Sequence, residues 1–405
     1  MEGGKPLHPG RIKIKISKTL QNKIRKGFPW VYYYQLRNRN IKGNPGDLGV
    51  IYDAGNRFLA VGLFDPFSDI RLRILQTGTP REIDSGFFRE RLEQALRLRI
   101  SLDATDTNAY RLVNGENDGF PGLVVDRYAE TLVFKIYTSA WLPYLEILVP
   151  LLQELTDARR GLLKLSRHVR RVHPEPGWDN QLLFGPPLEG PVTFLENGLK
   201  FEADVLHGQK TGFFLDQREN RLHIREWAKD GTVLNVFSYT GAFSVYALAG
   251  GAASVSEIEI SPQAQQAARR NVELNFGKEG DGRLHQISGD AFEQLAHLIR
   301  ENRTFDLVIL DPPAFASRKN QKQKALQAYW RLAKAGAQCT RPGGLLVSAS
   351  CSAQVSAREF YRAVDLGIRS TGRSCQKRLR TGHPQDHPVT FKEGGYLKAI
   401  YCRIL

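Results

Sequence analysis

The chain has 405 residues, 41% of them hydrophobic, which is enough for two or three domains with cores of their own. Lysine and arginine number 57 against 42 acidic residues, and the formal net charge of +15 favours a polyanionic partner. There is no apolar run of about 18 residues, no apolar segment of a secretory signal, and no zinc-ligand spacing among four cysteines. We therefore expect a cytoplasmic protein with no membrane span, disulfide framework or metal.

The basic residues are clustered. Residues 1–40 contain ten lysines and arginines against one acid, and further clusters lie in 159–171 and 318–334. The aromatic residues interleaved with them are Trp30, Tyr32, Tyr33, Tyr34, Tyr329 and Trp330. A solvated surface explains any single lysine, but the combination favours nucleic acid over an anionic membrane. Arg25, Lys26 and Trp30 are the predicted RNA contacts of the first cluster.

Residues 1–190 divide into two blocks. Residues 1–80 are predicted to be β-rich, because RIKIKIS alternates at period 2 and three short strand-like runs follow. KTLQNKIRKG predicts a short helix that ends at Gly27. Residues 81–190 mix amphipathic helical runs with strands, and their Pro- and Gly-rich end, 174–191, predicts a loop or linker.

Residues 191–405 have a different pattern. Apolar runs at 233–237, 254–260, 284–288, 305–310 and 343–350 alternate with helical patterns. This alternation predicts an α/β fold with a mostly parallel sheet that is covered on both faces, and the last segment, YLKAIYCRIL, predicts a further strand.

Ligands of such sheets bind at the carboxyl ends of the strands. Gly241 follows the first run, and Glu259 ends the second, where an acid suits ribose hydroxyls. Asp290 follows the third run, where it can accept from an adenine amino group, and Asp311 follows the fourth with Pro312 and Pro313. An ordinary turn and solvated acids would explain each residue alone. Together they predict an adenosine site, and the absence of glycine-rich phosphate motifs favours S-adenosylmethionine over NAD.

Cys351 ends the fifth run, GGLLVSASCS. Free cysteine often packs as a small apolar residue, and this interpretation fits Cys402, which lies inside the terminal strand. At a strand end, a thiolate can instead add to carbon 6 of a cytosine and make carbon 5 nucleophilic. Asp311 is then the predicted acid near the ring nitrogen.

Four motifs in this order resemble the RlmI-type family of 23S rRNA cytosine-5 methyltransferases: GQKTGFFLDQRENR (208–221), VLNVFSYTGAFS (233–244), LDPPAF (310–315) and SASCS (348–352). The resemblance covers nearly the whole chain. It implies a PUA-like RNA-binding domain in 1–80, an α+β middle domain in 81–190 and a class I, Rossmann-like methyltransferase domain in 191–405. It also implies a partner, 23S rRNA or a precursor of the large ribosomal subunit.

The resemblance also implies site residues. Lys210, Phe214, Asp216 and Arg218 would help to shape the site, with Asp216 and Arg218 meeting the ammonium and carboxylate of the methionine part. A capped helix start with a surface ion pair is the alternative for these two. The full cofactor set is Asp216, Arg218, Phe237, Tyr239, Gly241, Glu259, Asp290, Ala291 and Asp311. The implied substrate contacts near the site are Lys210, Pro312, Pro313 and Phe315.

Other functions stay open. Related enzymes that methylate a guanine nitrogen share the YTG and DPP motifs but lack SCS. Cys351 is therefore the residue that separates a cytosine-5 methyltransferase from a guanine-nitrogen methyltransferase. The DPPA motif has no second cysteine to release a covalent adduct. A non-catalytic RNA-binding assembly factor is the alternative outside the enzymes. The oligomeric state is not determined by the sequence, and a homodimer is one option.

Overall fold

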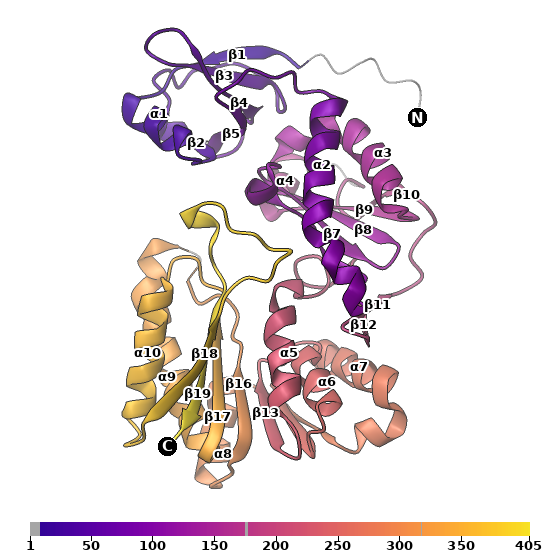
Figure 1. Ribbon diagram of the computed structural model, residues 1–405, viewed down its shortest axis with the longest axis vertical. Coiled ribbons are helices and arrows are strands. Elements are labelled where there is room, and N and C mark those ends of the chain that lie inside the picture. Colours follow the sequence, from indigo (N-terminus) through magenta and orange to yellow (C-terminus); the bar gives the residue numbers. More distant parts are fainter. Residues whose placement is uncertain (1–8, 175–176, 317) are drawn as a thin grey trace. The chain divides into compact units, whose positions relative to one another are not determined.

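The computed structural model describes residues 9–174, 177–316 and 318–405 (Figure 1). Lys5, part of the first basic cluster, lies outside them. The chain divides into two compact units. The first comprises Met1–Phe194, Ala203–Phe213 and Gln385–Lys392, and the second comprises Leu195–Glu202, Phe214–Pro384 and Glu393–Leu405. Two short segments therefore belong to the first unit although they follow its main part in sequence.

The first unit begins with a five-stranded sheet of order β1-β3-β4-β5-β2. Its elements are β1 (Arg11–Ile14), α1 (Lys18–Arg25), β2 (Trp30–Tyr32), η1 (Tyr33–Gln35), β3 (Leu48–Tyr52), β4 (Phe58–Phe64) and β5 (Ile70–Thr77). In β1 the lysine and arginine are exposed and Ile14 is buried, as the alternation predicts. The predicted helix is confirmed: Ser17 caps α1 by accepting from the Leu20 amide, and Gly27, with φ of 89°, follows its end.

A second five-stranded sheet, of order β10-β9-β8-β7-β6, completes the described core of this unit. Its elements are α2 (Ser85–Arg99), η2 (Ile100–Thr105), β6 (Ala109–Asn114), η3 (Gly115–Asp118), β7 (Leu123–Tyr128), β8 (Thr131–Ile136), η4 (Ser139–Tyr144), α3 (Leu145–Thr156), β9 (Arg160–Leu165), α4 (Arg167–Val172) and β10 (Gln181–Phe184). The prediction that 174–191 is only loop or linker is wrong at β10, because QLLF pairs antiparallel with β9. A two-stranded sheet, β11 (Val192–Glu196) and β12 (Leu199–Ala203), follows.

The second unit is built on a seven-stranded sheet of order β15-β14-β13-β16-β17-β19-β18. The strands are β13 (Thr232–Val236), β14 (Ser254–Glu259), β15 (Leu284–Ser288), β16 (Phe305–Leu310), β17 (Thr340–Ser350), β18 (Cys375–Thr381) and β19 (Lys398–Ile404). The first five are parallel, and β19 is antiparallel to both of its neighbours. The α/β prediction is confirmed. The sequence missed β18, because its exposed basic residues leave no apolar run.

Helices and short 3₁₀ turns connect these strands. They are η5 (Leu215–Gln217), α5 (Arg218–Trp227), α6 (Ala242–Ala249), α7 (Pro262–Asp281), α8 (Ala291–Arg300), η6 (Lys319–Gln321), α9 (Lys322–Cys339), α10 (Ala357–Arg369) and η7 (Lys392–Gly394). Leu234, Val308 and Leu346 of the sheet pack with α8, α9 and α10 on one face. Asn235, on the opposite side of β13, donates to Ser244 of α6. Both faces are therefore covered. No helix in the described residues is long and apolar enough to cross a membrane.

Candidate active site

The parallel strands β14, β13, β16 and β17 are neighbours, so their carboxyl ends lie at one edge of the sheet. We call Phe237–Gly241, Glu259, Asp311 and Cys351 the carboxyl edge. The strands that precede Asp311 and Cys351 are adjacent, since Leu310 of β16 pairs with Ser348 of β17. The topology therefore brings the predicted strand-end residues together.

The loop after β13 approaches its neighbours closely. Phe237, Tyr239 and Gly241 have φ of 63°, 49° and 72°, a conformation that non-glycine residues rarely adopt. The Phe237 and Ser238 amides donate to the Ile258 carbonyl, at 3.0 and 3.2 Å. A Cβ on Gly241 would lie 2.7 Å from the Ala268 Cβ. The position requires glycine, and strain of this kind is typical of ligand-binding loops.

Glu259, the last residue of β14, is held by backbone amides and is not a freely solvated acid. Its Oε2 accepts from the Tyr239 amide, and its Oε1 accepts from the amides of Ile260 and Ser261, all at 2.9 Å. Each carboxylate oxygen can accept two hydrogen bonds. Oε1 is therefore saturated, while Oε2 keeps capacity for a hydroxyl group such as those of a ribose.

Glu257, two residues earlier on β14, is a buried acid that sequence reasoning missed. Its side chain has no solvent exposure, and burial raises its pKa to about 7. A Cβ on Gly241 would lie 2.8 Å from its Oε1, so this acid lies directly under the strained loop. Its place in the middle of an apolar strand, SVSEIEI, was the available signal.

Asp290 and Ala291 begin α8. Asp290 is exposed and caps the helix through Oδ1, which accepts from the Phe292 and Glu293 amides at 2.9 and 3.2 Å. Among the described residues no group donates to its Oδ2, which is left for a donor such as an adenine amino group. Ala291 is buried. The geometry is compatible with the predicted base contact.

Asp216 and Arg218 lie in η5 and at the start of α5. Both side chains are buried. The Tyr396 hydroxyl donates to Asp216 Oδ2 at 2.7 Å, and Arg218 donates to Glu219 Oε1 at 3.3 Å. A surface ion pair is therefore the wrong description of Arg218. The side chain of Asp216 does not cap α5 either, because the N-cap position is Gln217.

The motif that carries Phe214 is anchored by a buried ion pair. Arg221 makes two hydrogen bonds to the Glu196 carboxylate, at 2.7 and 2.6 Å, and a third to the Phe214 carbonyl at 3.0 Å. The ring of Phe214 lies edge-on to Tyr239, 5.1 Å between centroids. Sequence reasoning missed Glu196 and Arg221, although the RENR run carries the arginine.

Asp311 follows β16 directly. Gln217, which sequence reasoning missed, donates to Asp311 Oδ1 at 2.8 Å. Pro312 is buried and Pro313 is exposed. The Phe315 ring packs 5.1 Å from that of Tyr329. The predicted DPP turn is therefore held at both ends: Gln217 bonds the Asp311 carboxylate, and the Tyr329 ring packs against Phe315.

Cys351 lies between two buried serines that hold the end of β17. The hydroxyls of Ser350 and Ser352 bond the Tyr329 hydroxyl of α9, at 2.9 and 2.8 Å. Cys351 directly follows Ser350, the last residue of β17. Its thiol is half-buried and its Sγ lies 3.9 Å from the Pro312 carbonyl. The structure thus brings Cys351 to the DPP turn.

The other cysteines are placed differently. Cys339 and Cys402 are buried, and burial raises the pKa of Cys339 to about 12. Core packing is therefore confirmed for Cys402. Cys375 begins β18 and is half-buried. Tyr329 was predicted as an aromatic of the third basic cluster, but it is buried, so a nucleic-acid contact is wrong for this residue.

The predicted RNA contacts of the first unit differ in accessibility. Arg25 is exposed and forms an ion pair with Asp53 at 3.3 Å, and Lys26 is exposed. The Trp30 indole instead donates to Glu116 at 2.7 Å and lies edge-on to Phe391. Trp30 is therefore committed to packing within the unit.

Lys210 is exposed, with φ of 53°, in a loop that the middle sheet holds. The hydroxyl of Thr211, its neighbour, donates to Asp126 Oδ2 at 2.6 Å and contacts the Tyr128 hydroxyl at 3.0 Å. Arg111 pairs with the same Asp126 carboxylate at 2.8 and 3.0 Å. The middle-domain signature thus fixes the loop that presents Lys210.

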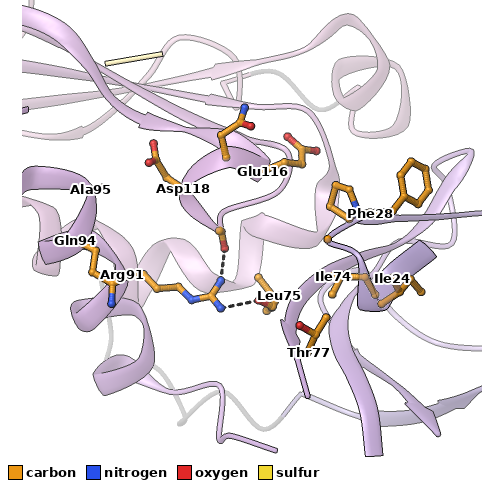
Figure 2. A pocket seen from close by; sticks show the side chains of 14 residues that line it. Ile24, Phe28, Ile74, Leu75, Thr77, Arg91, Gln94, Ala95, Glu116 and Asp118 are labelled. Carbon is orange, nitrogen blue, oxygen red and sulfur yellow. Dashed lines mark hydrogen bonds between the residues drawn. The ribbon is translucent and has the colours of Figure 1, made fainter. Parts of the chain in front are cut away.

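The first unit also contains a cavity of about 380 Å³ between α1, β5, α2 and η3 (Figure 2). Figure 2 shows the Arg91 guanidinium between two backbone carbonyls, and it donates to Gly119 at 2.7 Å and Leu75 at 2.6 Å. The wall carries two acids, Glu116 and Asp118, that are paired with arginines. The polar groups of the cavity wall are thus joined to other groups of the same unit by hydrogen bonds and ion pairs. Across the described ranges, no group of three or more His, Cys, Asp or Glu could hold a metal ion.

Comparisons with known proteins identify the family of the chain. The family model of S-adenosylmethionine-dependent methyltransferases matches residues 111–362, and that of PUA-like domains matches residues 14–77. A "Ribosomal RNA large subunit methyltransferase" of Deinococcus radiodurans is 44% identical over 97% of this chain and 98% of its own. A "Ribosomal RNA large subunit methyltransferase I" of Alteromonas mediterranea is 34% identical over 97% and 98%. The chain belongs to the RlmI family of methyltransferases.

Solved structures support the fold of this RlmI-family chain. A methyltransferase, SMU.776, crystallised with SAH aligns with a TM-score of 0.83 at 21% identity, covering 97% of this chain and 100% of its own. A SAM-dependent methyltransferase from Streptococcus mutans aligns with a TM-score of 0.82. The predicted Rossmann-like domain with an N-terminal PUA-like domain is confirmed, and the cofactor of the family is S-adenosylmethionine. The close approach at Gly241 and the remaining acceptor of Glu259 fit an adenosine-bearing molecule of this kind.

Proposed function

We propose that the protein methylates carbon 5 of a cytosine in large-subunit ribosomal RNA, through a covalent adduct with Cys351. The observation that carries the proposal is the position of Cys351: half-buried, at the carboxyl end of β17, and 3.9 Å from the carbonyl of the DPP turn. Relatives named ribosomal RNA large subunit methyltransferases support the substrate class. Such a substrate would place the protein in the cytoplasm.

The cofactor would lie along the carboxyl edge. Glu259 Oε2 would accept a ribose hydroxyl, Asp290 Oδ2 would accept from the adenine amino group, and the Phe237–Gly241 loop would cover the sugar. Asp216 and Arg218 would face the amino and carboxylate groups. When bound, S-adenosylmethionine supplies an electrophilic methyl group to carbon 5.

The role of Cys351 follows from cytosine chemistry. Its thiolate adds to carbon 6, forming an S–C6 bond and moving the electron pair of the C5=C6 double bond to carbon 5. After carbon 5 has gained its methyl group, a base removes the carbon 5 proton. The electrons of that C–H bond restore the double bond and expel the thiolate. The target base must be unpaired or flipped, because both carbons are attacked from the ring face.

Asp311 is the proposed acid and base beside the ring. The Gln217 amide fixes its Oδ1, and the next residue in the stiff Pro312–Pro313 turn is the one whose carbonyl lies 3.9 Å from Cys351 Sγ. A carboxyl at this position can hydrogen-bond the ring nitrogen as charge develops there. It is also the candidate for removing the carbon 5 proton, a role that needs no second thiol.

We propose that the RNA is held by the aromatic face of the β-rich module, defined as Tyr32, Tyr33, Tyr34, Arg39 and Arg71. Tyr34 is 65% exposed and stacks on Tyr32, with 5.5 Å between ring centroids. The guanidinium groups of Arg39 and Arg71 lie 5.5 and 5.0 Å from the Tyr33 ring. Stacked exposed rings beside cations are typical of single-stranded nucleic-acid contacts. Lys210 would add a phosphate contact.

A decisive assay would use labelled S-adenosylmethionine and ribosomal RNA lacking the modification, with nucleosides identified by mass spectrometry. We expect label in 5-methylcytidine for the wild-type protein and none for Cys351→Ala. Label in a guanosine derivative that the mutation leaves unchanged would instead assign the protein to the nitrogen-methylating enzymes. Cofactor binding without transfer to any RNA would favour an assembly factor.

A further inference from the structure

Lys398, the first residue of β19, is a buried cation that none of the motifs contains. It pairs with Ser350 across the two antiparallel strands, and its side chain is buried. Its Nζ donates to the carbonyls of Ser352 at 2.6 Å, Val355 at 2.8 Å and Tyr396 at 3.0 Å. These bonds use all three donors of an ammonium group. Burying a cation without a carboxylate partner is costly, so this lysine needs an explanation beyond packing.

Two of the three carbonyls belong to the turn that follows Cys351. The Val355 amide donates to the Ser352 carbonyl at 3.2 Å, which closes the turn, and Lys398 binds the carbonyls at both of its ends. On the preceding side, Ser350 and Ser352 are fixed to Tyr329. The backbone on both sides of the cysteine is therefore held by buried groups.

The three hydrogen bonds of this lysine go to carbonyl groups, so none of them joins its ammonium to a carboxylate. Burial lowers the pKa of Lys398 to about 8, so it is protonated at pH 7, and Cys351 and Glu359 act electrostatically to raise that pKa. Glu359 of α10 is itself paired with Lys322 at 2.5 Å. Tyr329 of α9 is neutral because burial raises its pKa further, and Asp311, after β16, accepts from Gln217.

We propose that Lys398 is a positioning residue for Cys351: its ammonium anchors the turn after the cysteine and supplies the positive charge that favours the thiolate. The proposal rests on the proposed function, since it assigns a supporting group to that nucleophile. A cation beside a cysteine increases the thiolate fraction, and the thiolate is the nucleophilic form. Lys398 contacts neither substrate nor cofactor in this role.

Alkylation of the full-length protein by iodoacetamide, followed residue by residue by mass spectrometry between pH 5.5 and 9.5, tests the proposal. In the wild type, the pH at which the alkylation rate of Cys351 is half-maximal should lie below ~8.5, the pKa of an ordinary cysteine. In Lys398→Met, the alkylation rate of Cys351 at pH 7 should fall roughly tenfold. This is the decrease in thiolate fraction expected when the half-maximal pH rises by one unit. Lys398→Arg, which keeps the charge, should restore most of the rate. Cys375 is the internal control, and its rate should be the same in all three proteins.

Two outcomes would overturn the proposal. One is a half-maximal pH for Cys351 alkylation at or above ~8.5 in the wild type. This measurement uses no variant, so it tests the proposal even if Lys398→Met does not fold. The other is an equal Cys351 rate in the wild type and Lys398→Met, with Cys375 unchanged. Failure of the proposed function would look different: Cys351→Ala would still form methylated RNA, whatever the alkylation rates show.

Discussion

The carboxyl edge of the seven-stranded sheet and the aromatic face of the β-rich module differ in how their functional groups are held. At the carboxyl edge, Glu259 accepts three backbone amides and the serines beside Cys351 are bonded to a buried tyrosine. On the aromatic face, Tyr33 and Tyr34 are 40% and 65% exposed and contact mainly other rings and arginines. Fixed geometry serves bond making, while an exposed surface serves many weak contacts. Single substitutions should therefore have large effects at the first region and small effects at the second.

After Cys351→Ala, which should abolish methyl transfer, the largest effect is expected at Asp311. Asp311→Asn keeps the size and the hydrogen bond to residue 217 but cannot exchange a proton, so turnover should fall by roughly 10²–10⁴-fold, the usual contribution of an acid or base. Single-turnover methyl transfer to RNA measures this, with cofactor affinity determined in parallel. Cys375→Ala, at the edge of the same sheet, should retain full activity. An Asp311→Asn protein with wild-type turnover would remove the acid–base role.

Glu257 should make stability depend on pH. Its folded pKa of about 7 lies above its ordinary value of 4.5, so the folded protein binds more protons between these values. The free energy of unfolding should therefore fall as pH rises from 4.5 to 7, by on the order of 3 kcal/mol. Glu257→Gln should abolish this fall, as measured by urea unfolding at pH 5 and pH 8. In the control variant Glu273→Gln, which changes an exposed glutamate, the free energy of unfolding should still fall with pH. If wild type and Glu257→Gln differ in this free energy by the same amount at pH 5 and pH 8, the raised pKa of Glu257 is contradicted.

Gly241→Ala should weaken cofactor binding. The added Cβ would lie 2.7 Å from Ala268, and overpacking of this kind typically costs about 1–3 kcal/mol, so the affinity should fall by roughly 10- to 100-fold. Isothermal titration calorimetry with S-adenosylmethionine gives the value. Gly372→Ala is the matched control, because Gly372 has φ of 77° but no atom within 4 Å of its Cβ position. Equal affinities of the two variants would mean that the close approach at Gly241 is irrelevant to the ligand.

The smallest effect is expected on the aromatic face. Tyr34→Ala should weaken RNA binding by about 1 kcal/mol, roughly fivefold, as expected for the loss of one stacked ring. Fluorescence anisotropy with a single-stranded ribosomal RNA fragment measures it. Ile100→Ala removes another exposed side chain of the same unit and should have no effect. If both variants bind like the wild type, the RNA is held elsewhere.

The difference between the two regions also explains what the sequence could predict. Strand ends follow from apolar runs, so Gly241, Glu259, Asp311 and Cys351 could be placed at one edge before the structure was known. Their partners could not, because Tyr329, Gln217 and Lys398 come from elements distant in sequence. Tyr329 and Lys398 lie in none of the four motifs, and the 208–221 motif that contains Gln217 does not show that this residue bonds Asp311. On the β-rich module, composition predicted a basic aromatic surface but could not show that Trp30 bonds Glu116 while Tyr34 is exposed. The edge strand β18 was missed because exposed basic residues interrupt its pattern.

The segment Gln385–Lys392 belongs to the first unit although it follows β18, close to the end of the chain. The buried Arg99 donates to the Asp386 carbonyl, and the Arg111 amide donates to the Asp386 carboxylate, across separations of 287 and 275 residues. During synthesis on the ribosome, the first unit can therefore not complete its hydrogen bonds until almost the whole chain has emerged. Contacts this distant in sequence slow folding, because the intervening chain must be ordered first. A fragment that ends before residue 385 would lack the Asp386 partner of both Arg99 and the Arg111 amide, so the two units cannot be separated by one cut.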